Sequence, residues 1–294
     1  MKLKVLDQTN TEKGSKELPQ VFSEQVRPDL IKRAVESLQA NAMQRYGADP
    51  MAGKKCSANL SRRRSKYRGS YGHGISRVPR KIHSRSGTRF NWTGAFAPGT
   101  VGGRRAHPPK ASKILARKIN IKERRKAIRS AIAATTVKDF TSERGHVAPA
   151  TYPFIITNDF ETLSKTKQVV DALKKLGFGD ELKRTEVKTY RAGKSRLRGR
   201  KYRKKKGPLF VVADKCALLK SAAGIAGAEV VTVEQLNAEL LAPGAVPGRV
   251  TLFTEAAIEK LDREKLFYDK PKQAKPKQKR RRPKQRPRRS IYRP

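Results

Sequence analysis

Two short motifs contain glycines of the kind that bind nucleotide phosphates, but neither motif is complete. Ala192-Gly193-Lys194-Ser195 matches the end of a P-loop, but the first glycine of that motif would stand at Lys188 and the loop should follow a buried strand. Gly177-Phe178-Gly179 lacks the third glycine of a dinucleotide-binding turn and is typical of a helix end. No Ser/His/Asp arrangement stands out either. The sequence therefore predicts no catalytic residue, no cofactor and no small-molecule substrate.

The histidines and cysteines are too scattered to predict a metal site. Protein metal sites use closely spaced pairs of these residues. No such pair occurs among His73, His83, His107, His146, Cys56 and Cys216. Two isolated cysteines are typical of free thiols in a reducing compartment. We therefore expect no metal, and we interpret the first three histidines as nucleic-acid contacts or simply exposed side chains.

Net charge is the strongest chemical signal in the chain. The 294 residues include 69 Lys or Arg and 25 Asp or Glu, giving a formal net charge of +44. A fold with this excess repels itself and binds polyanions, of which nucleic acid is the simplest. An anionic membrane is the alternative, but there is no signal-peptide pattern and no apolar run near the roughly 20 residues that span a bilayer. We therefore expect a soluble intracellular protein without a membrane partner.

The positive charge is concentrated in three segments that contain no carboxylate. Residues 50–122 have no acidic side chain and carry fifteen Lys or Arg between positions 54 and 110. Residues 187–213 form a second such run, and the thirteen basic residues after Asp269 form a third. By contrast, residues 207–269 hold nine acids and six Lys or Arg. An acid-balanced body thus carries three basic segments, which is not the mixed-sign pattern of an ordinary solvated surface.

The acid-balanced parts predict alternating strands and helices. Short strands are expected at residues 3–6, 154–156, 209–212, 230–231 and 250–253. The last four are apolar without alternation, and each is followed by a helical pattern. This order favours an α/β fold with a mostly parallel sheet covered by helices.

The helices are predicted from apolar spacing and from capping residues. Pro28 opens a helix that Gly47 ends, and isoleucines at helical spacing predict a long helix over residues 112–137. Asn158 is a candidate N-cap for a helix that continues to Gly177. Further predicted caps are Asp214 for a short helix around Leu218 and Thr232 with Gln235 as a capping box. Thr254 leads into the last predicted helix, which contains Ala257, Ile258 and Leu261.

These elements predict one globular α/β domain made of residues 1–47 and 111–268. Two predicted helices flank residues 48–110, so this stretch is expected to be a long extended basic loop inserted near the N-terminus. Residues 188–207 are a basic loop within the domain, and residues 269–294 are a basic C-terminal tail. A generic solubility or targeting segment is the alternative for the tail.

The loop of residues 48–110 is expected to order only against RNA. It is rich in Gly, Arg, Ser and Pro and has no apolar period, so it cannot offset an ordering entropy of about 1–2 kcal/mol per residue. Arginine forks bind phosphates and stack on bases. The candidate RNA contacts are Arg62, Arg63, Arg64, Lys66, Tyr67, Arg68, Tyr71, His73, Arg77, Arg80, Lys81, Arg85, Arg89, Trp92, Phe96, Arg104, Arg105, His107 and Lys110, with Arg196, Arg198, Arg200, Lys201 and Arg203 in the second basic loop.

Aromatic residues among these charges are candidates for stacking on unpaired bases. Tyr67, Tyr71, Phe90, Trp92 and Phe96 could each contribute roughly 1–3 kcal/mol in this way. The alternative for Trp92 and Phe96 is that they pack on each other or on a neighbouring protein.

Three motifs of the loop, in this order, resemble a known family. Gly74-Ile75-Ser76-Arg77-Val78-Pro79-Arg80, Gly94-Ala95-Phe96 and the run from Gly102 to Lys110 are similar to the extended loop of the universal large-subunit ribosomal protein L-four family. Arg117-Lys118-Ile119-Asn120 and the strand-helix body also resemble that family, so the similarity covers nearly the whole chain. The match is to the archaeal and eukaryotic branch, and the absence of a long C-terminal extension favours an archaeal source.

The resemblance implies a structural constituent of the large ribosomal subunit that works in cytoplasmic ribosomes. Its partners would be large-subunit ribosomal RNA and neighbouring ribosomal proteins, including L-twenty-two. Arms near Arg62–Arg77 and Gly102–Lys110 would thread into the RNA, support subunit assembly and carry a tip that helps to line the peptide exit tunnel. The tip residues implied to face the tunnel are Arg80, Lys81, His83, Arg85, Arg89 and Trp92.

An RNA-processing enzyme with basic extensions is the alternative function. A metal-dependent nuclease needs carboxylates beside its RNA groove, and the basic segments contain none. A methyltransferase should show a Gly-rich turn after its first strand, and the sequence has no such turn. Both observations favour a structural protein over an enzyme.

Overall fold

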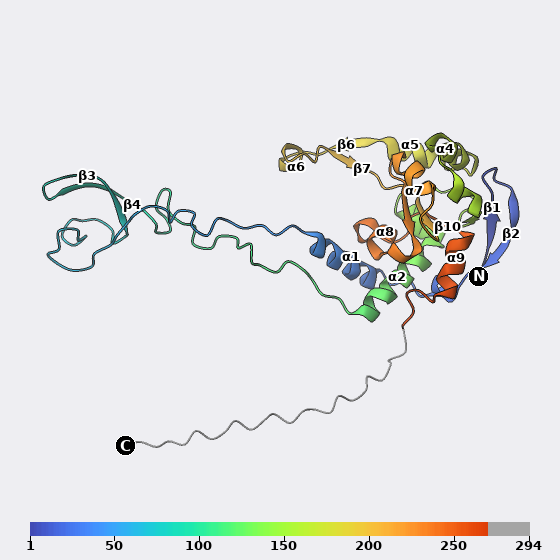
Figure 1. Ribbon diagram of the computed structural model, residues 1–294, viewed down its shortest axis with the longest axis horizontal. Coiled ribbons are helices and arrows are strands. Elements are labelled where there is room, and N and C mark those ends of the chain that lie inside the picture. Colours follow the sequence, from blue (N-terminus) through green and yellow to red (C-terminus); the bar gives the residue numbers. More distant parts are fainter. Residues whose placement is uncertain (270–294) are drawn as a thin grey trace, which may run out of the picture. The chain divides into compact units, whose positions relative to one another are not determined.

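A six-stranded sheet forms the centre of the body in the computed structural model, which describes residues 1–269 (Figure 1). The strand order is β2-β1-β5-β10-β8-β9, and all neighbouring pairs are parallel except β1 with β2. The strands are β1 (Lys2–Leu6), β2 (Glu12–Glu17), β5 (Ile155–Ile156), β8 (Leu209–Val212), β9 (Glu229–Thr232) and β10 (Thr251–Thr254). Every residue of β8 and β10 is buried, as expected for strands covered on both faces. The predicted α/β class with a mostly parallel sheet is confirmed, while β2 was not predicted.

Helices cover both faces of this sheet. The helical elements of the body are η1 (Gln20–Ser23), α2 (Ile121–Thr135), α3 (Lys138–Glu143), η2 (Asn158–Thr162), α4 (Thr166–Lys175), α5 (Gly179–Glu186), α7 (Leu218–Ser221), η3 (Ala222–Gly224), η4 (Val233–Gln235), α8 (Ala238–Leu241), η5 (Pro243–Ala245) and α9 (Glu255–Arg263). On one face, Phe210 and Leu252 share a core cluster with Leu173 of α4 and Leu182 of α5. On the other face, Phe253 meets η1 through an edge-on contact with Phe22, whose ring centroid is 5.2 Å away.

The described chain divides into two compact units. One unit contains Met1–Ile31 and the described residues from Asn120 onward, and the other contains Lys32–Ile119. The division into a domain and a loop at residues 47/48 and 110/111 stays a prediction. The basic tail of residues 270–294 lies outside the described residues.

The helix predicted over residues 112–137 is wrong at its beginning, because α2 begins at Ile121. The backbone of Arg117 is held by side chains of α1 (Pro28–Ala42). Its N–H donates to Asn41 Oδ1 at 3.1 Å, and its carbonyl accepts from Ser37 Oγ at 2.7 Å. These bonds occupy the groups that a helix through Arg117 would need, so the chain stays extended there.

The first helix also ends earlier than predicted. It begins at Pro28 as expected but ends at Ala42, before Gly47. Gly47 lies instead where two segments touch, since an added Cβ would lie 2.3 Å from the backbone nitrogen of Ala111. The glycine therefore permits a close backbone approach and does not end a helix.

The single helix predicted from Asn158 to Gly177 is two elements, η2 and α4. Asn158 does not cap its own helix, because its Oδ1 accepts the backbone N–H of Ala256 in α9 at 2.9 Å. The carbonyl of Leu163 accepts Ser221 Oγ at 2.7 Å, and the backbone at Leu163 is extended. The end at Gly177 is confirmed by its left-handed φ of 88°.

Two other predicted caps are wrong. Asp214 does not cap a helix, because its carboxylate pairs with Lys260 Nζ at 2.7 Å. Thr232 begins only the 3-10 turn η4 and makes no side-chain cap. Asn237 instead caps α8 by accepting the N–H of Leu240. The helix predicted after Thr254 is confirmed as α9, and Thr254 Oγ1 caps it by accepting the N–H of Ala257.

Candidate nucleic-acid interface

The basic loop contains a β-hairpin, although its sequence has no sustained apolar period. Strands β3 (Arg80–Ser86) and β4 (Arg89–Gly94) pair antiparallel around Gly87, whose φ is 55°. The register shifts between Ile82 and Ser84, so His83 stands at a bulge, and its Nε2 lies 3.0 Å from Thr93 Oγ1. The hairpin fixes the directions of side chains that the sequence could place only in a loop.

Two extended arms lead to the hairpin (Figure 1) and contact each other at several points. The N–H of Ala48 donates to the carbonyl of Pro109 at 2.9 Å. At Gly53, φ is 72° and an added Cβ would lie 2.5 Å from the backbone nitrogen of Arg104. The arms thus approach at distances that only glycine allows at this position.

Aromatic rings form a continuous series on the hairpin and the segment before it. Tyr67 and Phe90 have ring centroids 5.4 Å apart, and Phe90 stacks on Trp92 at 5.1 Å. The guanidinium of Arg85 lies 5.3 Å from the centre of the Tyr67 ring, and that of Arg80 lies 5.7 Å from the centre of the Trp92 ring. The alternation of rings and guanidinium groups provides flat surfaces of the kind on which nucleobases stack.

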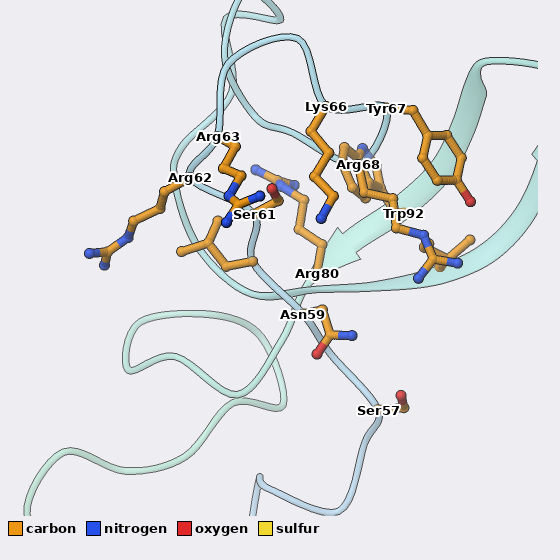
Figure 2. A pocket seen from close by; sticks show the side chains of 12 residues that line it. Ser57, Asn59, Ser61, Arg62, Arg63, Lys66, Tyr67, Arg68, Arg80 and Trp92 are labelled. Carbon is orange, nitrogen blue, oxygen red and sulfur yellow. The ribbon is translucent and has the colours of Figure 1, made fainter.

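A hollow of about 840 Å³ opens beside this series (Figure 2). It is lined by Ser57, Asn59, Leu60, Ser61, Arg62, Arg63, Lys66, Tyr67, Arg68, Arg80, Ile82 and Trp92. The lining therefore joins five cationic side chains to two aromatic rings without a carboxylate. Arg80 Nε is buried and has no hydrogen-bond partner in the described structure, while its Nη2 donates to the carbonyl of Ser76. An acceptor from a ligand would satisfy this buried donor.

The remaining predicted residues of the loop lie outside the hollow. The guanidinium of Arg77 covers the ring of Tyr71 at 4.6 Å, and His73 is exposed. Phe96 is 37% exposed in a left-handed conformation, and the ring that stacks on Trp92 belongs to Phe90. Arg64, Lys81 and Arg89 are exposed. On the returning arm, Arg105, His107 and Lys110 line a smaller hollow, and Arg104 is half-buried.

The second basic loop is also a hairpin. Strands β6 (Lys188–Tyr190) and β7 (Tyr202–Lys204) pair antiparallel, and the turn α6 (Lys194–Leu197) lies at their far end. Figure 1 shows this ribbon projecting from the body. The predicted contacts on it, Arg196, Arg198, Arg200, Lys201 and Arg203, are all exposed.

Three residues of this ribbon were not predicted as contacts. The rings of Tyr190 and Tyr202 lie 5.0 Å apart across the strands. Lys188 Nζ lies 5.9 Å from the centre of the Tyr202 ring, and Lys201 Nζ lies 5.6 Å from that of Tyr190. The available signal was a tyrosine beside basic residues at two positions of the acid-free run, Tyr190 and Tyr202. Pairing these positions would have placed the two rings together.

The described part of the chain contains neither a metal cluster nor a membrane-spanning helix. Among residues 1–269, no group of three or more His, Cys, Asp or Glu side chains could hold a metal ion. Within the same residues, no helix combines the length and apolar character needed to cross a bilayer.

Comparison with known proteins identifies the family. The family model of the ribosomal protein L4/L1 family matches residues 16–264. The chain belongs to this family. The resemblance seen in the loop motifs is thereby confirmed over most of the chain. As a member of the L4/L1 family it is a structural ribosomal protein and not an enzyme, it works in cytoplasmic ribosomes, and the alternative of an RNA-processing enzyme is removed.

Three archaeal relatives of the L4/L1 family carry the curated name "Large ribosomal subunit protein uL4". The protein of Nanoarchaeum equitans is 47% identical over 256 residues, covering 87% of this chain and 95% of the relative. That of Halobacterium salinarum is 43% identical over 264 residues, covering 89% and 99%. That of Methanosphaera stadtmanae is 45% identical over 248 residues, covering 83% and 90%.

Proposed function

We propose that this chain is a structural component of the large ribosomal subunit that binds its ribosomal RNA through the loop of residues 48–110 and the β6–β7 ribbon. The observation that carries the proposal is the hollow at the hairpin, where five cations and two rings meet without a carboxylate. Guanidinium groups bind phosphates with forked geometry, and rings stack on unpaired bases. The L4/L1 family membership and the names of the relatives agree with this assignment.

The two arms would place the hairpin deep within RNA. Their close contact at Gly53 and Ala48 makes a narrow double strand that carries the exposed cations Lys55, Arg105 and Lys110. Such a strand can pass between RNA helices and neutralise phosphates on both sides. Arg62–Arg77 and Gly102–Lys110 would provide these arm contacts and thereby support subunit assembly.

The hairpin would form the tip that helps to line the peptide exit tunnel, opposite the loop of ribosomal protein L-twenty-two. Of the six tip residues, Lys81, His83, Arg85 and Arg89 are exposed and are free to face a lumen. Arg80 and Trp92 are half-buried in the wall of the hollow, which favours an RNA contact for these two.

The proposal is tested by measuring the affinity of the full chain for transcribed large-subunit RNA over a range of salt concentrations. A triple variant Arg62→Gln, Arg63→Gln, Arg68→Gln should reduce the slope of log K against log salt by up to about 0.7 for each phosphate that is no longer neutralised. The matched control is Lys2→Gln, Lys183→Gln, Arg263→Gln, which neutralises three exposed cations of the body. Equal slopes for the wild-type chain and the triple variant would contradict the assignment of the loop.

A further inference from the structure

A second basic hollow lies in the body, at the base of the β6–β7 ribbon. Its volume is about 420 Å³. It is lined by Arg144, His146, Arg184, Thr189, Arg203, Lys204, Lys205, Lys206, Pro243 and Gly244. Six of these ten residues are Lys or Arg, and none is acidic. The residues come from the segment after α3, from α5, from both ribbon strands and from η5, so only the tertiary fold brings them together.

One wall of the hollow is held rigidly by a buried carboxylate, Glu181. Arg184 donates to both of its oxygens, at 2.7 and 2.6 Å, and the Nδ1 of His146 donates to Oε1 at 2.7 Å. The N–H of Val147 adds a bond to Oε2 at 2.9 Å. Arg184 also donates to the carbonyl of Lys206 at 2.7 Å and so fixes the chain where the ribbon ends. The charge of Arg184 is therefore already balanced.

The charge of Arg144 is not balanced. Its Nη1 donates to the carbonyl of Val246 at 2.7 Å, and no carboxylate among residues 1–269 forms an ion pair with it. Burial, together with the nearby charges of Arg249 and Arg184, lowers the pKa of Arg144 to about 10. A half-buried guanidinium among other cations is unfavourable unless an anion neutralises it.

The carboxylates near Arg144 are already paired with other cations. Lys206 and Arg249 both pair with Glu229, the one other carboxylate of this network within the described residues. Three cations thus pair with Glu181 and Glu229. Together with Arg144 there are four positive charges against two negative ones, so two positive charges remain. Arg203, Lys204 and Lys205 at the rim are exposed and add to this excess.

We propose that this hollow binds one backbone phosphate of ribosomal RNA, with Arg144 as the principal ligand and Thr189 and the rim cations around it. The inference rests on the proposed RNA-binding function and assigns it a second, separate contact on the body. Phosphate oxygens accept several donors at once and match a site that offers cations without carboxylates. RNA is favoured over a free phosphate ion because the hollow opens beside the exposed cations of the ribbon.

The inference is tested with Arg144→Gln in the full chain, measured beside Arg263→Gln as a matched control. Arg263 is exposed and its nearest carboxylate, Glu264, is 3.9 Å away. We expect Arg144→Gln to weaken RNA binding about tenfold at low salt and to reduce the slope of log K against log salt by about 0.7. The control should leave both values unchanged. Arg144→Lys keeps the charge and should restore most of the slope.

A second variant keeps the test valid if Arg144→Gln fails to fold. Thr189→Glu places a carboxylate at the exposed rim without touching the buried network, and Thr9→Glu adds the same charge at an exposed turn. Thr189→Glu should weaken RNA binding more than Thr9→Glu does. Equal affinities for this pair, or a wild-type slope for folded Arg144→Gln, would overturn the inference.

Inorganic phosphate separates the two sources of the ligand. Thermal unfolding of the wild-type chain in phosphate and in chloride at equal ionic strength reports binding of the free ion. Phosphate could stabilise the wild-type chain but not Arg144→Gln, while both proteins bind RNA with the same affinity. In that case the site binds a free phosphate ion and the RNA assignment is wrong. If the wild-type chain itself fails to bind RNA, the proposed function fails, whereas binding that is insensitive to Arg144 removes only this site.

Discussion

The guanidinium of Arg80 lies 5.7 Å from the centre of the Trp92 ring, although Arg80 pairs with Gly94 and Trp92 with Ile82 in the β3–β4 register. Both side chains line the same hollow, and Arg80 Nε is buried there without a partner among the described residues. A base that stacks near Trp92 would come within reach of this donor. The pair thus combines a stacking surface with a hydrogen-bond donor whose desolvation is already complete.

Replacement of Trp92 by alanine should weaken binding to large-subunit RNA by about 1–3 kcal/mol, because one stacking surface is removed. The salt dependence should remain unchanged, since no charge is removed. Tyr46→Ala is the control, because Tyr46 is 64% exposed on the arm and outside the hollow. Titration of labelled RNA with both variants gives the comparison. Equal losses for Trp92→Ala and Tyr46→Ala would argue against a specific base contact.

Replacement of Gly53 by alanine should separate the two arms. The new Cβ would lie 2.5 Å from the backbone of Arg104 and would also require a left-handed φ of 72°. Gly72→Ala is the matched control, since its φ is 78° but nothing lies within 4 Å of the added atom. Each variant carries about 1–2 kcal/mol of left-handed strain, and only Gly53→Ala adds a clash. Limited proteolysis of the arms should therefore accelerate more for Gly53→Ala, and equal rates would refute the close approach of the arms.

The free energy of unfolding of the body should fall in acid because of Glu181. Burial alone would raise the pKa of this carboxyl, but hydrogen bonds from Arg184, His146 and Val147 outweigh burial and lower it to about 2, from 4.5. A lowered folded-state pKa stabilises the protein above the unfolded pKa, and this stability is lost as the pH falls from about 5 towards 2. Burial lowers the pKa of His146 as well, which acts in the same direction.

Glu181→Gln tests this pH dependence. The variant should be roughly 3 kcal/mol less stable at neutral pH, because half-buried Arg184 loses its carboxylate partner. Its unfolding free energy should also change less between about pH 5 and pH 2. Urea unfolding of the full chain at several pH values gives both quantities. Asp180→Asn is the control, since Asp180 is 75% exposed. An unaltered acid profile for Glu181→Gln would exclude the proposed cause.

Neutralisation of Arg196, Arg198 and Arg200 by glutamine should reduce the salt dependence of RNA binding without changing the stability of the body. All three side chains are exposed at the end of the β6–β7 ribbon, so they contribute little to folding. The slope should fall by about 0.7 for each phosphate that these arginines neutralise in the wild-type complex. Thermal unfolding and salt-dependent binding of the same variant check both parts. A drop in the unfolding temperature would indicate a structural role instead.

A chain without residues 50–110 should keep a folded body. The six-stranded sheet and its helices lie in Met1–Ile31 and beyond Asn120, outside the deleted segment. Far-ultraviolet circular dichroism and cooperative thermal unfolding test this expectation directly. Ribosomes that contain the shortened chain should be defective near the tunnel. An unfolded product would show that the loop is needed for the core and would contradict the insertion.

The hydrophobic pattern predicted the central strands because a strand that is buried on both faces is a continuous run of apolar residues in the sequence. Residues 209–212 and 250–253 are apolar without alternation, since strands β8 and β10 are covered on both faces. The helix after Thr254 was predicted correctly for a similar reason, because Ala257, Ile258 and Leu261 recur at helical spacing and are buried in α9. Edge strand β2 is mostly exposed and polar, so its sequence contains no apolar run and the strand was not predicted.

The features that local pattern predicted wrongly depend on partners far along the chain. Asn158 bonds to Ala256 and Asp214 to Lys260, so neither residue was available to cap the helix that follows it. The hairpin of β3 and β4 lacks a sustained apolar period, because only Phe90 and Trp92 of β4 alternate with polar residues and β3 is almost entirely exposed.

The sequence by itself determined the chemistry of this protein: three carboxylate-free segments on an acid-balanced α/β body, and loop motifs of the L4/L1 family. Composition and local pattern suffice for these properties, because each residue's charge and hydrophobicity can be read from the sequence without knowing its distant neighbours. Tertiary structure alone decided the strand order, the ring series from Tyr67 to Trp92, and the unbalanced charge of Arg144 beside the ribbon. These depend on distances between residues that the chain brings together only by folding.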